Sequence, residues 1–449
     1  MNKRTDLTQG SPGRGLLLFA LPMILGNLFQ QFYNTTDSLI VGNYVGMDAL
    51  AAVGASYSLT TVFIMIAIGS GNGAAVLTAQ YLGAGQYRKM KTSISTALIT
   101  LLVISLLLGS VGLLLNGAIL KALKTPEDIL DQAKLYLGIY FLGMPFLFMY
   151  NVLAAVFNAL GDSRTPLGLL IFSSLLNVML DLISVTWFGM GVDGVAIATV
   201  TAQGVSVLLS FLLLLRKLHG FYDSGAERVL LYDRDMLVAG SRIAVPTILQ
   251  QSIVSIGMLL VQSVVNGFGT EALAGYSAGT RIESICTVPM IATGNAVATF
   301  TAQNIGAGKI DRVRQGYRAS YVIAAAFAVV SAVLLKTLHE PIIAAFLGNE
   351  RSPVAFETGT GYLSFIAFFF FFIGLKTSVD GLLRGAGDVL IVTAANLVNL
   401  SIRVIGASTL APLWGVKAVW YVIPLGWLAN YLISFLRYLL GKWQEKNVI

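Results

Sequence analysis

The sequence predicts an all-α integral membrane protein of about twelve transmembrane helices, arranged as two six-helix bundles related by a parallel repeat. Three observations predict this class. Of the 449 residues, 56% are hydrophobic, only 11% are charged, and the mean hydropathy is +0.78, so there are too few polar side chains to cover a water-soluble globule of this size. Apolar runs of about 20 residues or more, enough to cross a bilayer, recur along the chain. The second half also repeats short motifs of the first half in the same order.

The apolar runs divide the chain into two sets of predicted helices. The first run, residues 16–41, is too long for a signal-peptide core and lacks a cleavage pattern, so we expect a retained helix. The runs that complete the first bundle are 49–82, 94–120, 129–160, 166–188 and 192–215. After a polar connection, the second bundle comprises 237–268, 272–305, 317–335, 354–383, 389–413 and 416–440. We therefore expect an N-terminal lobe of residues 1–215, a cytoplasmic linker of residues 216–236 and a C-terminal lobe of residues 237–449.

The distribution of Lys and Arg predicts the orientation in the membrane. Most of them lie on the same side as the N-terminus, and those on the opposite side are Lys121, Lys124, Lys134, Lys336, Arg351 and Lys417. Because cytoplasmic loops carry the excess of positive charge, both termini are expected in the cytoplasm of a multi-pass protein of the plasma (inner) membrane. The net charge of +7 is the sum of this loop bias. No basic segment is interleaved with exposed aromatic residues, so we expect no nucleic-acid partner.

An internal repeat relates the two bundles. Thr-Ala-Gln at residues 78–80 and Gly-Ala-Gly at 83–85 recur at 301–303 and 306–308, an offset of 301 − 78 = 223 residues. Because this offset contains six predicted helices, an even number, both bundles run the same way through the membrane. Such a parallel repeat is typical of two-lobed transporters that work by rocking.

The order and spacing of several motifs resemble those of the multidrug and toxic compound extrusion (MATE) family, over nearly the whole chain. The motifs are Leu21-Pro22, Gln30-Gln31-Phe32-Tyr33, Asp37, Val41-Gly42, Ala51-Ala52-Val53-Gly54, Ala79-Gln80, Gly83-Ala84-Gly85, Arg281-Ile282-Glu283, Pro289 and Leu383-Arg384-Gly385-Ala386-Gly387-Asp388. The resemblance implies an antiporter that expels organic, often cationic, compounds through a central cleft in exchange for inward H⁺ or Na⁺, without a cofactor. The alternative is a flippase or exporter of a lipid-linked or amphipathic metabolite in the same superfamily.

Charged residues inside the first bundle indicate an ion site. Asp37 and Asp181 lie at predicted depths of about 6 Å and about 10 Å from the outer helix ends, and Thr199 lies at a similar depth. Asn177 precedes Asp181 by four residues and shares its helix face. The resemblance implies that Asp37, Asn177 and Asp181 hold the coupling H⁺ or Na⁺, with Thr199 and Asn151 as further ligands and no other metal. The alternative is a polar cluster that only fixes helix packing.

Charged residues in the second bundle define a second polar site, whose members are Arg281, Glu283, Lys376, Asp380 and Arg403. The repeat aligns Asp181 with Arg403, so a cation site in this lobe would lose its carboxylate. Lys376 and Asp380 are four residues apart, which predicts a structural ion pair on one helix face. A role of this pair in gating or coupling is the alternative.

Pro22 interrupts the hydrogen-bond ladder of the first helix on the cytoplasmic side of Asp37, which predicts a kink that either gates transport or is only structural.

Gly69, Gly71 and Gly73 resemble a phosphate loop, but no Lys-Ser or Lys-Thr follows, so close helix packing explains them better and we expect no nucleotide. No nucleophile, metal set or acid–base pair indicates an enzyme, and the two histidines, His219 and His339, fall in predicted loops. The partners we expect are small organic substrates and the lipid bilayer, and we expect a monomer.

Overall fold

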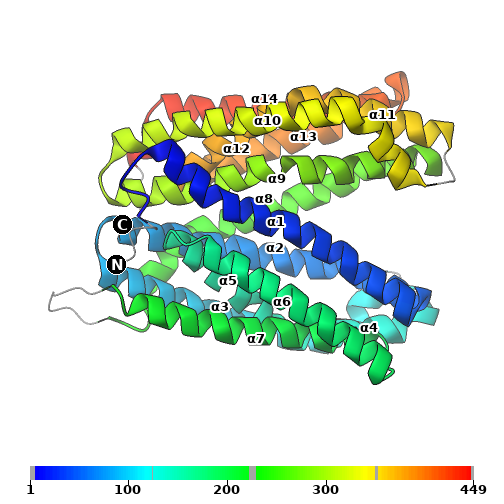
Figure 1. Cartoon of the computed structure of the whole chain (residues 1–449), viewed down its shortest axis with the longest axis horizontal. Coiled ribbons are helices and arrows are strands. Elements are labelled where there is room, and N and C mark those ends of the chain that lie inside the picture. The colour runs from blue at the N-terminus through cyan, green and yellow to red at the C-terminus, as the bar shows by residue number, and fades with distance from the viewer. Residues whose placement is uncertain (1–5, 124, 222–228, 349–351, 446–449) are drawn as a thin grey trace. The chain divides into compact units, whose positions relative to one another are not determined.

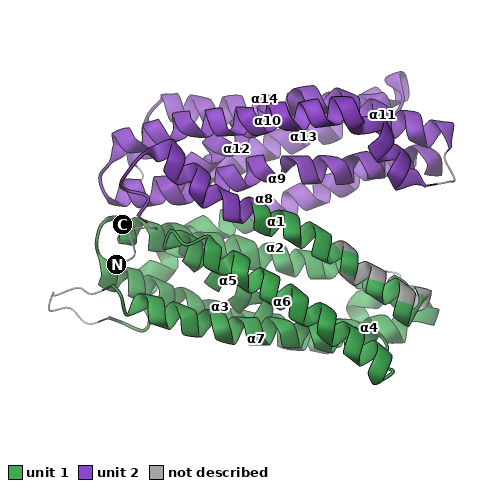
Figure 2. Ribbon diagram, viewed as in Figure 1, with its two compact units in different colours: residues 1–5, 25–248 green, residues 6–24, 249–449 purple. Residues whose placement is uncertain are grey.

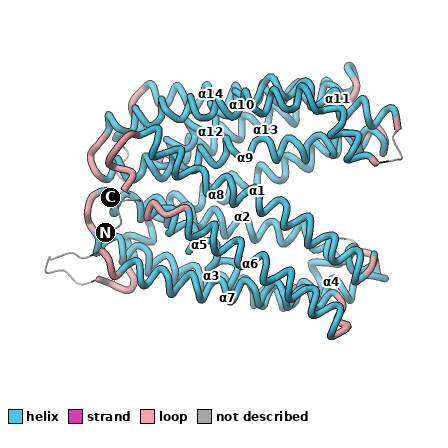
Figure 3. The backbone as a smooth tube through the Cα atoms, in the orientation of Figure 1, coloured by secondary structure: helices cyan, strands magenta, loops and turns pink. Residues whose placement is uncertain are grey.

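The computed structural model describes residues 6–123, 125–221, 229–348 and 352–445, with side chains at all of these except 35, 37–39, 43, 47, 48, 50 and 58. Helices joined by short turns make up this part of the chain, and Figure 3 shows no strand in it. The elements of the first half are α1 (Pro12–Ile40), the π-helical turn η1 (Val41–Val45), α2 (Met47–Gly83), α3 (Tyr87–Ala122), α4 (Glu127–Leu142), α5 (Met144–Ala159), α6 (Arg164–Leu182), the π-helical turn η2 (Ile183–Trp187) and α7 (Val192–Leu218).

The second half repeats this order of helices (Figure 1). Its elements are α8 (Arg234–Asn266), α9 (Thr270–Gly306), α10 (Ile310–Leu347), α11 (Pro353–Ile366), the 3₁₀ turn η3 (Ala367–Phe369), α12 (Phe370–Gly385), α13 (Val389–Trp414), α14 (Lys417–Leu439) and the 3₁₀ turn η4 (Lys442–Glu445). The prediction for His339 was wrong, because α10 extends well past the apolar run that predicted it and contains His339. The outer part of α10 is polar enough to have been mistaken for a loop.

The number of membrane spans agrees with the sequence. Within the described ranges, eleven helical segments are long and apolar enough to cross a membrane, and α4 with α5 forms a twelfth that is bent by 50°. The bend occurs at Gly143, where a Cβ atom would lie 2.5 Å from the side chain of Val200 on α7. Glycine is therefore needed where α7 passes the bend. The prediction of about twelve helices is confirmed.

The repeated Gly-Ala-Gly motif has the same structure in both halves. It closes α2 and α9, and its last residue adopts a left-handed conformation, with φ of 70° at Gly85 and 69° at Gly308. This region of backbone conformation favours glycine, because a Cβ atom would crowd the following carbonyl. The recurrence of the motif therefore marks two equivalent helix-to-helix turns.

The helices form two compact units, which Figure 2 colours separately. Unit 1 contains Leu25–Ile248 and unit 2 contains Asp6–Ile24 and Leu249–Ile449. Helices α1 and α8 therefore each belong to both units. Each helix changes unit three residues after an internal proline, since 25 − 22 = 3 for Pro22 and 249 − 246 = 3 for Pro246. Proline weakens a helix at its own turn, so the two crossings fall beside the most deformable points of these helices.

The segment before α1 is anchored in unit 2, and we call residues 6–11 the N-terminal strap. Leu7 is buried, and the Arg312 guanidinium of α10 donates to the carbonyl oxygens of Leu7 (3.2 Å), Gln9 (2.6 Å) and Gly10 (2.7 Å). Lys309 donates to the Thr8 carbonyl at 2.9 Å. The N-terminal end of α1 is thus held within unit 2 by charge-assisted hydrogen bonds.

The segment before α8 is anchored in unit 1 in the corresponding way, and we call residues 229–233 the linker strap. Its Leu230 and Asp233 backbone N–H groups donate to the hydroxyls of Thr92 (3.1 Å) and Thr96 (3.0 Å) on α3. Ser95 returns a hydrogen bond to the Leu230 carbonyl at 3.2 Å. Both crossing helices therefore begin on one unit and end in the other.

Glycines bring the helices of each unit into close contact. A Cβ atom on Gly71 would lie 3.2 Å from Ala155 of α5, and one on Gly73 would lie 2.6 Å from the Gly240 carbonyl of α8. In unit 2, a Cβ atom on Gly381 of α12 would lie 2.2 Å from the Gly294 carbonyl of α9. Small residues allow such close approach in membrane bundles. The packing interpretation of Gly69, Gly71 and Gly73 is thereby confirmed, since Gly69 likewise faces Ile248 of α8.

Candidate functional site

Helix α6 places two buried polar groups on one face. Asp181 is 0% exposed and Asn177, one turn earlier, is 2% exposed. Asp181 lies two residues before the start of η2, and α1, which carries Asp37, is followed directly by η1. The two π-helical turns contact each other. A π turn inserts one residue into a helix, and such turns occur often at functional sites. The C-terminal ends of α1 and α6 therefore share an irregular geometry beside the predicted acids.

Asn177 is the centre of a hydrogen-bond chain that joins three helices. The Tyr33 hydroxyl of α1 donates to Asn177 Oδ1, and Asn177 Nδ2 donates to Thr199 Oγ1 of α7 at 3.4 Å. Thr199 Oγ1 in turn donates to the Val195 carbonyl at 3.0 Å. The structure thus brings Asn177 and Thr199 together, as their similar predicted depths indicated, and adds Tyr33 to them.

The position of Asp37 is defined by its helix. Its side chain lies outside the described part of the chain, but its backbone belongs to α1 four residues after Tyr33. The backbone thus places position 37 one helical turn beyond Tyr33. The meeting of the Asp37 and Asp181 carboxyl groups stays a prediction.

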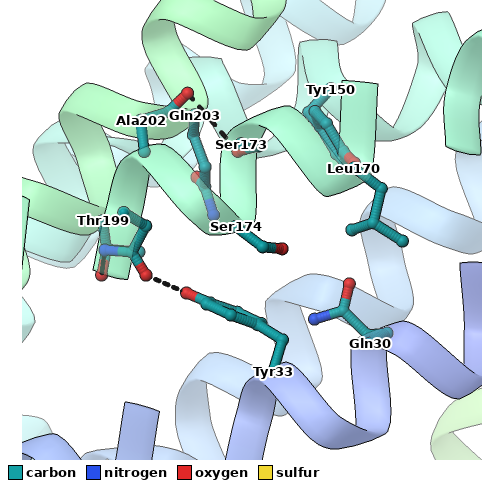
Figure 4. Close-up of a pocket in the computed structure, with 10 residues that line it drawn as sticks. Gln30, Tyr33, Tyr150, Leu170, Ser173, Ser174, Thr199, Ala202 and Gln203 are labelled. Carbon is teal, nitrogen blue, oxygen red and sulfur yellow. Dashed lines mark hydrogen bonds between the residues drawn. The ribbon is translucent and has the colours of Figure 1, made fainter. Parts of the chain in front are cut away.

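A small cavity adjoins the Asn177 chain inside unit 1, and Figure 4 shows Gln30 and Tyr33 lying across it from Ser174. Its volume is about 60 Å³, which is enough for a few water molecules or a hydrated ion. Its described lining residues, none of them charged, are Gln30, Tyr33, Tyr150, Leu170, Ser173, Ser174, Asn177, Thr199, Ala202 and Gln203. Hydroxyl and amide groups from α1, α5, α6 and α7 therefore surround a space next to the predicted ion site.

Asn151 is not among the cavity-lining residues. Its Nδ2 donates to the Leu147 carbonyl one turn earlier on α5, at 2.9 Å, while its neighbour Tyr150 lines the cavity. Sequence reasoning also missed Tyr33 and Gln203 as lining residues. The signal for Tyr33 was its place one turn before Asp37, whereas a glutamine in an apolar run gives little indication of the helix that it faces.

Asp380 is the centre of a buried polar cluster in unit 2. Its carboxylate lies 3.4 Å from Lys376 Nζ and accepts hydrogen bonds from Ser434 (2.7 Å) and Asn396 (3.4 Å). With its amide nitrogen turned toward the carboxylate, Asn430 donates to both oxygens at 3.2 Å. The predicted pairing of Lys376 with Asp380 is confirmed, while its role stays a prediction. Helices α12, α13 and α14 all contribute to the cluster.

Glu283 belongs to a different group of residues in unit 2. It accepts a hydrogen bond from the Tyr362 hydroxyl of α11, and the charge of Arg403 on α13 acts on both residues. Within the described part of the chain, the buried Arg403 Nε has no hydrogen-bond acceptor. Arg281 is exposed. The five residues predicted as a second polar site therefore fall into an Asp380 cluster, a Glu283 cluster and an exposed Arg281.

Equivalent ion pairs hold the turn between α5 and α6 in unit 1 and the turn between α12 and α13 in unit 2. Asp162 lies 2.5 Å from Lys217 in unit 1, and Asp388 lies 2.5 Å from Arg437 in unit 2. Both aspartates follow a glycine of the repeat. Burial raises the pKa of Asp162, but hydrogen bonds from Lys217 and Thr165 outweigh it, so its pKa lies below the ordinary value.

Comparison with known proteins gives consistent matches over the whole chain. The MatE family model matches residues 22–183 and 246–409, one match in each half of the repeat. The probable multidrug resistance protein YpnP of Bacillus subtilis (strain 168) is 32% identical over 447 residues, which cover 99% of each chain. The probable multidrug resistance protein NorM of Thermotoga maritima is 25% identical, over 97% of this chain and 94% of that protein.

Solved structures agree on the fold. An outward-facing multidrug resistance MATE family transporter of the MOP superfamily superposes with a TM-score of 0.90, at 21% identity and over 99% of both chains. At this identity the likeness concerns the fold alone. It confirms the all-α, two-bundle fold class that the apolar runs and the repeat predicted.

Proposed function

The chain belongs to the MatE family of transporters, and from that premise we propose that it is a secondary active antiporter that exports organic, cationic compounds in exchange for inward H⁺ or Na⁺. Asp37 and Asp181 bind the coupling ion, together with Asn177 and Thr199. The single observation that carries this proposal is the complete burial of Asp181 on the helix face of Asn177, whose amide joins α1, α6 and α7.

Electrostatics explains why a cation is taken up there. A charged side chain in the membrane interior costs about 2.5–3.5 kcal/mol on insertion scales, and two nearby carboxylates also repel each other. A proton neutralises one of them. Na⁺ is held instead by carboxylate oxygens with the amide and hydroxyl oxygens of Asn177 and Thr199, because hard cations prefer oxygen ligands.

Helix α1 connects ion binding to the rest of the cycle. It carries Asp37 near its outer end, Gln30 and Tyr33 at the cavity, and Pro22 beside the crossing into unit 2. A change of charge at Asp37 and Asp181 therefore acts on a helix whose cytoplasmic end is held by the N-terminal strap. A ligand shifts a conformational equilibrium only by its different affinities for the two states, so antiport requires the ion and the substrate to favour opposite states. A coupling of about 1–3 kcal/mol corresponds to a 5- to 150-fold mutual reduction in affinity.

The described residues around the proposed ion site give no support to an anionic substrate. The described lining of the cavity consists of apolar, hydroxyl and amide side chains, without Lys or Arg. A flippase for an anionic lipid-linked sugar would need basic groups to bind phosphate, and this part of unit 1 offers none. The names of the relatives, which refer to multidrug resistance, point to the same broad substrate class.

The proposed location is the plasma (inner) membrane, with both termini in the cytoplasm. Cysteine labelling tests this topology in a Cys286→Ser background, because Cys286 is the single native cysteine. A membrane-impermeant maleimide applied to intact cells should label Lys121→Cys and Lys336→Cys but not Arg314→Cys. Labelling of the first two sites only after the cells are opened would overturn the orientation.

Transport in proteoliposomes tests the function. Export of a cationic dye is measured with a pH gradient in Na⁺-free buffer, and then with a Na⁺ gradient at equal pH. We expect one of the two gradients to drive export by the wild-type protein but not by the Asp37→Asn or Asp181→Asn variant. Asp311→Asn is the control and should behave like wild type, because the side chain of Asp311 is 88% exposed. Wild-type gradient-driven export by the double Asp37→Asn, Asp181→Asn variant would refute the proposed ion site.

A further inference from the structure

A groove of about 400 Å³ lies between the outer ends of α3 and α4, apart from the predicted ion site. Asn116 of α3 lies at its back, and α4 contributes two charges, a glycine and three apolar residues. Its lining residues are Asn116, Asp131, Lys134, Leu135, Gly138, Ile139 and Leu142. The groove thus combines opposite charges with an apolar surface.

The two charges of the groove are held apart. Asp131 and Lys134 are three residues apart on α4, a spacing at which opposite charges commonly pair, yet no ion pair joins them in the described structure. Lys134 instead extends along α3, where its Nζ lies 3.9 Å from the position of a Cβ atom on Gly117. A zwitterion whose two charges are separated by a few bonds matches this arrangement.

Asn116 adds a hydrogen-bond acceptor without a donor. Its side chain is 5% exposed, and Nδ2 donates to the Lys134 carbonyl at 2.7 Å, which fixes the orientation of the amide. Oδ1 has no donor among the described residues. A buried acceptor that lacks a donor is unfavourable, so a ligand with N–H groups gains by reaching it. Gly138 leaves the space open, because a Cβ atom there would lie 3.3 Å from Asn116 Nδ2.

The surroundings of the groove are those of a lipid-facing surface. Leu135 is 51% exposed, Leu142 is 64% exposed and Leu114 of α3 is 85% exposed, and in a membrane span such residues face acyl chains. Asn116 precedes the outer end of α3 by six residues, about 9 Å along the helix. The polar part of the groove is therefore near the level of the outer headgroups.

We propose that this groove binds one phospholipid with a primary ammonium headgroup, phosphatidylethanolamine. The ammonium group donates to the Asp131 carboxylate and Asn116 Oδ1, the phosphate pairs with Lys134, and the acyl chains lie on Leu135 and Leu142. Phosphatidylcholine has no N–H to donate, and phosphatidylglycerol has no cation for Asp131. This inference does not depend on the proposed transport function.

The repeat provides a matched control in unit 2. At the offset of 223 residues, Gly138 corresponds to Gly361 and Lys134 to Glu357, so the charge is reversed, and Glu357 pairs with Lys417 at 3.3 Å. A Cβ atom on Gly361 would meet nothing within 4 Å. Gly361→Leu therefore adds the same side chain as Gly138→Leu at an equivalent but open position.

Native mass spectrometry of the delipidated, full-length protein tests the site. The protein is titrated with palmitoyl-oleoyl phosphatidylethanolamine, phosphatidylcholine or phosphatidylglycerol, and bound lipids are counted. We expect one phosphatidylethanolamine to bind about tenfold more tightly than the other lipids, in the wild-type protein and in Gly361→Leu but not in Gly138→Leu. Asp131→Asn and Lys134→Gln alter exposed side chains and keep the fold, and each should weaken this binding. Equal binding of the three lipids, or an unchanged preference in folded Gly138→Leu or in Asp131→Asn, would overturn the proposal.

Discussion

The two units share one repeat but balance their buried charges differently. In unit 1, the buried Asp181 shares its helix face with Asn177, whose described partners, Tyr33 and Thr199, are neutral. In unit 2, the equivalent position is Arg403 (403 − 181 = 222), and the buried Asp380 lies 3.4 Å from Lys376. A carboxylate with a built-in cation gains less from binding H⁺ or Na⁺ than one that depends on a mobile ion.

This difference predicts that the two similar bundles have different roles. A repeat that places acids, amides and hydroxyls at equivalent depths creates two potential ion sites. Side-chain cations in unit 2, Lys376 and Arg403, occupy the electrostatic role that we propose for the coupling ion in unit 1. We therefore expect unit 1 to respond to ion gradients and the Asp380 cluster of unit 2 to act mainly in folding.

Breaking the Lys376–Asp380 pair gives the largest expected effect. Asp380→Asn leaves the buried Lys376 without its counter-charge, and such losses cost about 3–5 kcal/mol. We expect a marked fall in the yield of folded protein and in its thermal stability, measured by fluorescence-detected size exclusion and by thermal unfolding.

The double variant Lys376→Met, Asp380→Leu is the control, because replacing both charges leaves no unpaired group, and it should recover much of the yield. If Asp380→Asn instead folds normally but loses gradient-driven export, the Asp380 cluster does not act mainly in folding. Unit 2 would then take part in coupling.

The straps offer a second way to compare the units. Arg312→Ala removes the guanidinium that holds three carbonyl oxygens of the N-terminal strap. We expect a loss of about 1–2 kcal/mol and faster proteolysis within residues 6–11. The linker strap of unit 1 rests on neutral hydroxyls, so Thr96→Ala should cost less.

Arg314→Ala is the matched control for Arg312→Ala. Arg314 lies two residues away, is 46% exposed in its side chain, and pairs only with the exposed Asp311 in the described structure. Its removal should change neither stability nor proteolysis measurably. Equal behaviour of the two variants would show that the strap is not held by Arg312.

The hydrogen-bond chain of unit 1 gives a smaller effect. Tyr33→Phe removes the donor to Asn177 Oδ1 and should cost about 0.5–1.5 kcal/mol, which corresponds to a two- to tenfold weaker coupling-ion affinity. The ion dependence of dye export measures this shift. Tyr321→Phe removes a hydroxyl from the Tyr317–Tyr321–Tyr431 chain of unit 2 and should leave the ion dependence unchanged. An equal shift in both variants would contradict a site confined to unit 1.

The sequence predicted spacing within helices better than contacts between them. Helical periodicity placed Asn177 with Asp181 and Lys376 with Asp380, because residues four apart on one helix must share a face. It did not predict that Tyr33 bonds Asn177, or that Ser434 bonds Asp380, because those contacts depend on how helices rotate against each other. Apolar runs likewise located the spans. The run that predicted α10 ended too early, so His339 was wrongly placed in a loop.

The crossing helices show a second limit of sequence reasoning. Pro22 marked a deformable point of the first helix, and Pro246 occupies the corresponding position in the second half, at an offset of 246 − 22 = 224 residues. Hydropathy does not report which bundle each half of α1 packs against, so the change of unit after each proline emerged only from the contacts.

The Asp162–Lys217 and Asp388–Arg437 ion pairs give the smallest effect and compare the units under acid conditions. The folded-state pKa of Asp162 lies below its ordinary value because hydrogen bonds from Lys217 and Thr165 favour the charged form despite burial. The pair therefore stabilises the fold fully above the unfolded-state pKa, about 3.9, and this contribution is lost as the pH falls through the lower folded-state value. Asp162→Asn should lower stability by about 0.5–1 kcal/mol at pH 7, because the pair is partly solvated.

Thermal unfolding of wild type and Asp162→Asn between pH 7 and about pH 3 measures this difference, which should be constant at neutral pH and narrow only in the acid range. Asp388→Asn sharpens the comparison. The Asp388 side chain is 3% exposed against 16% for Asp162, while both ion pairs have a 2.5 Å separation. Breaking the more buried pair leaves Arg437 with less solvent to replace the carboxylate, so Asp388→Asn should cost more. A gap between wild type and Asp162→Asn that does not change with pH would show that Asp162 acts through packing and not through its charge.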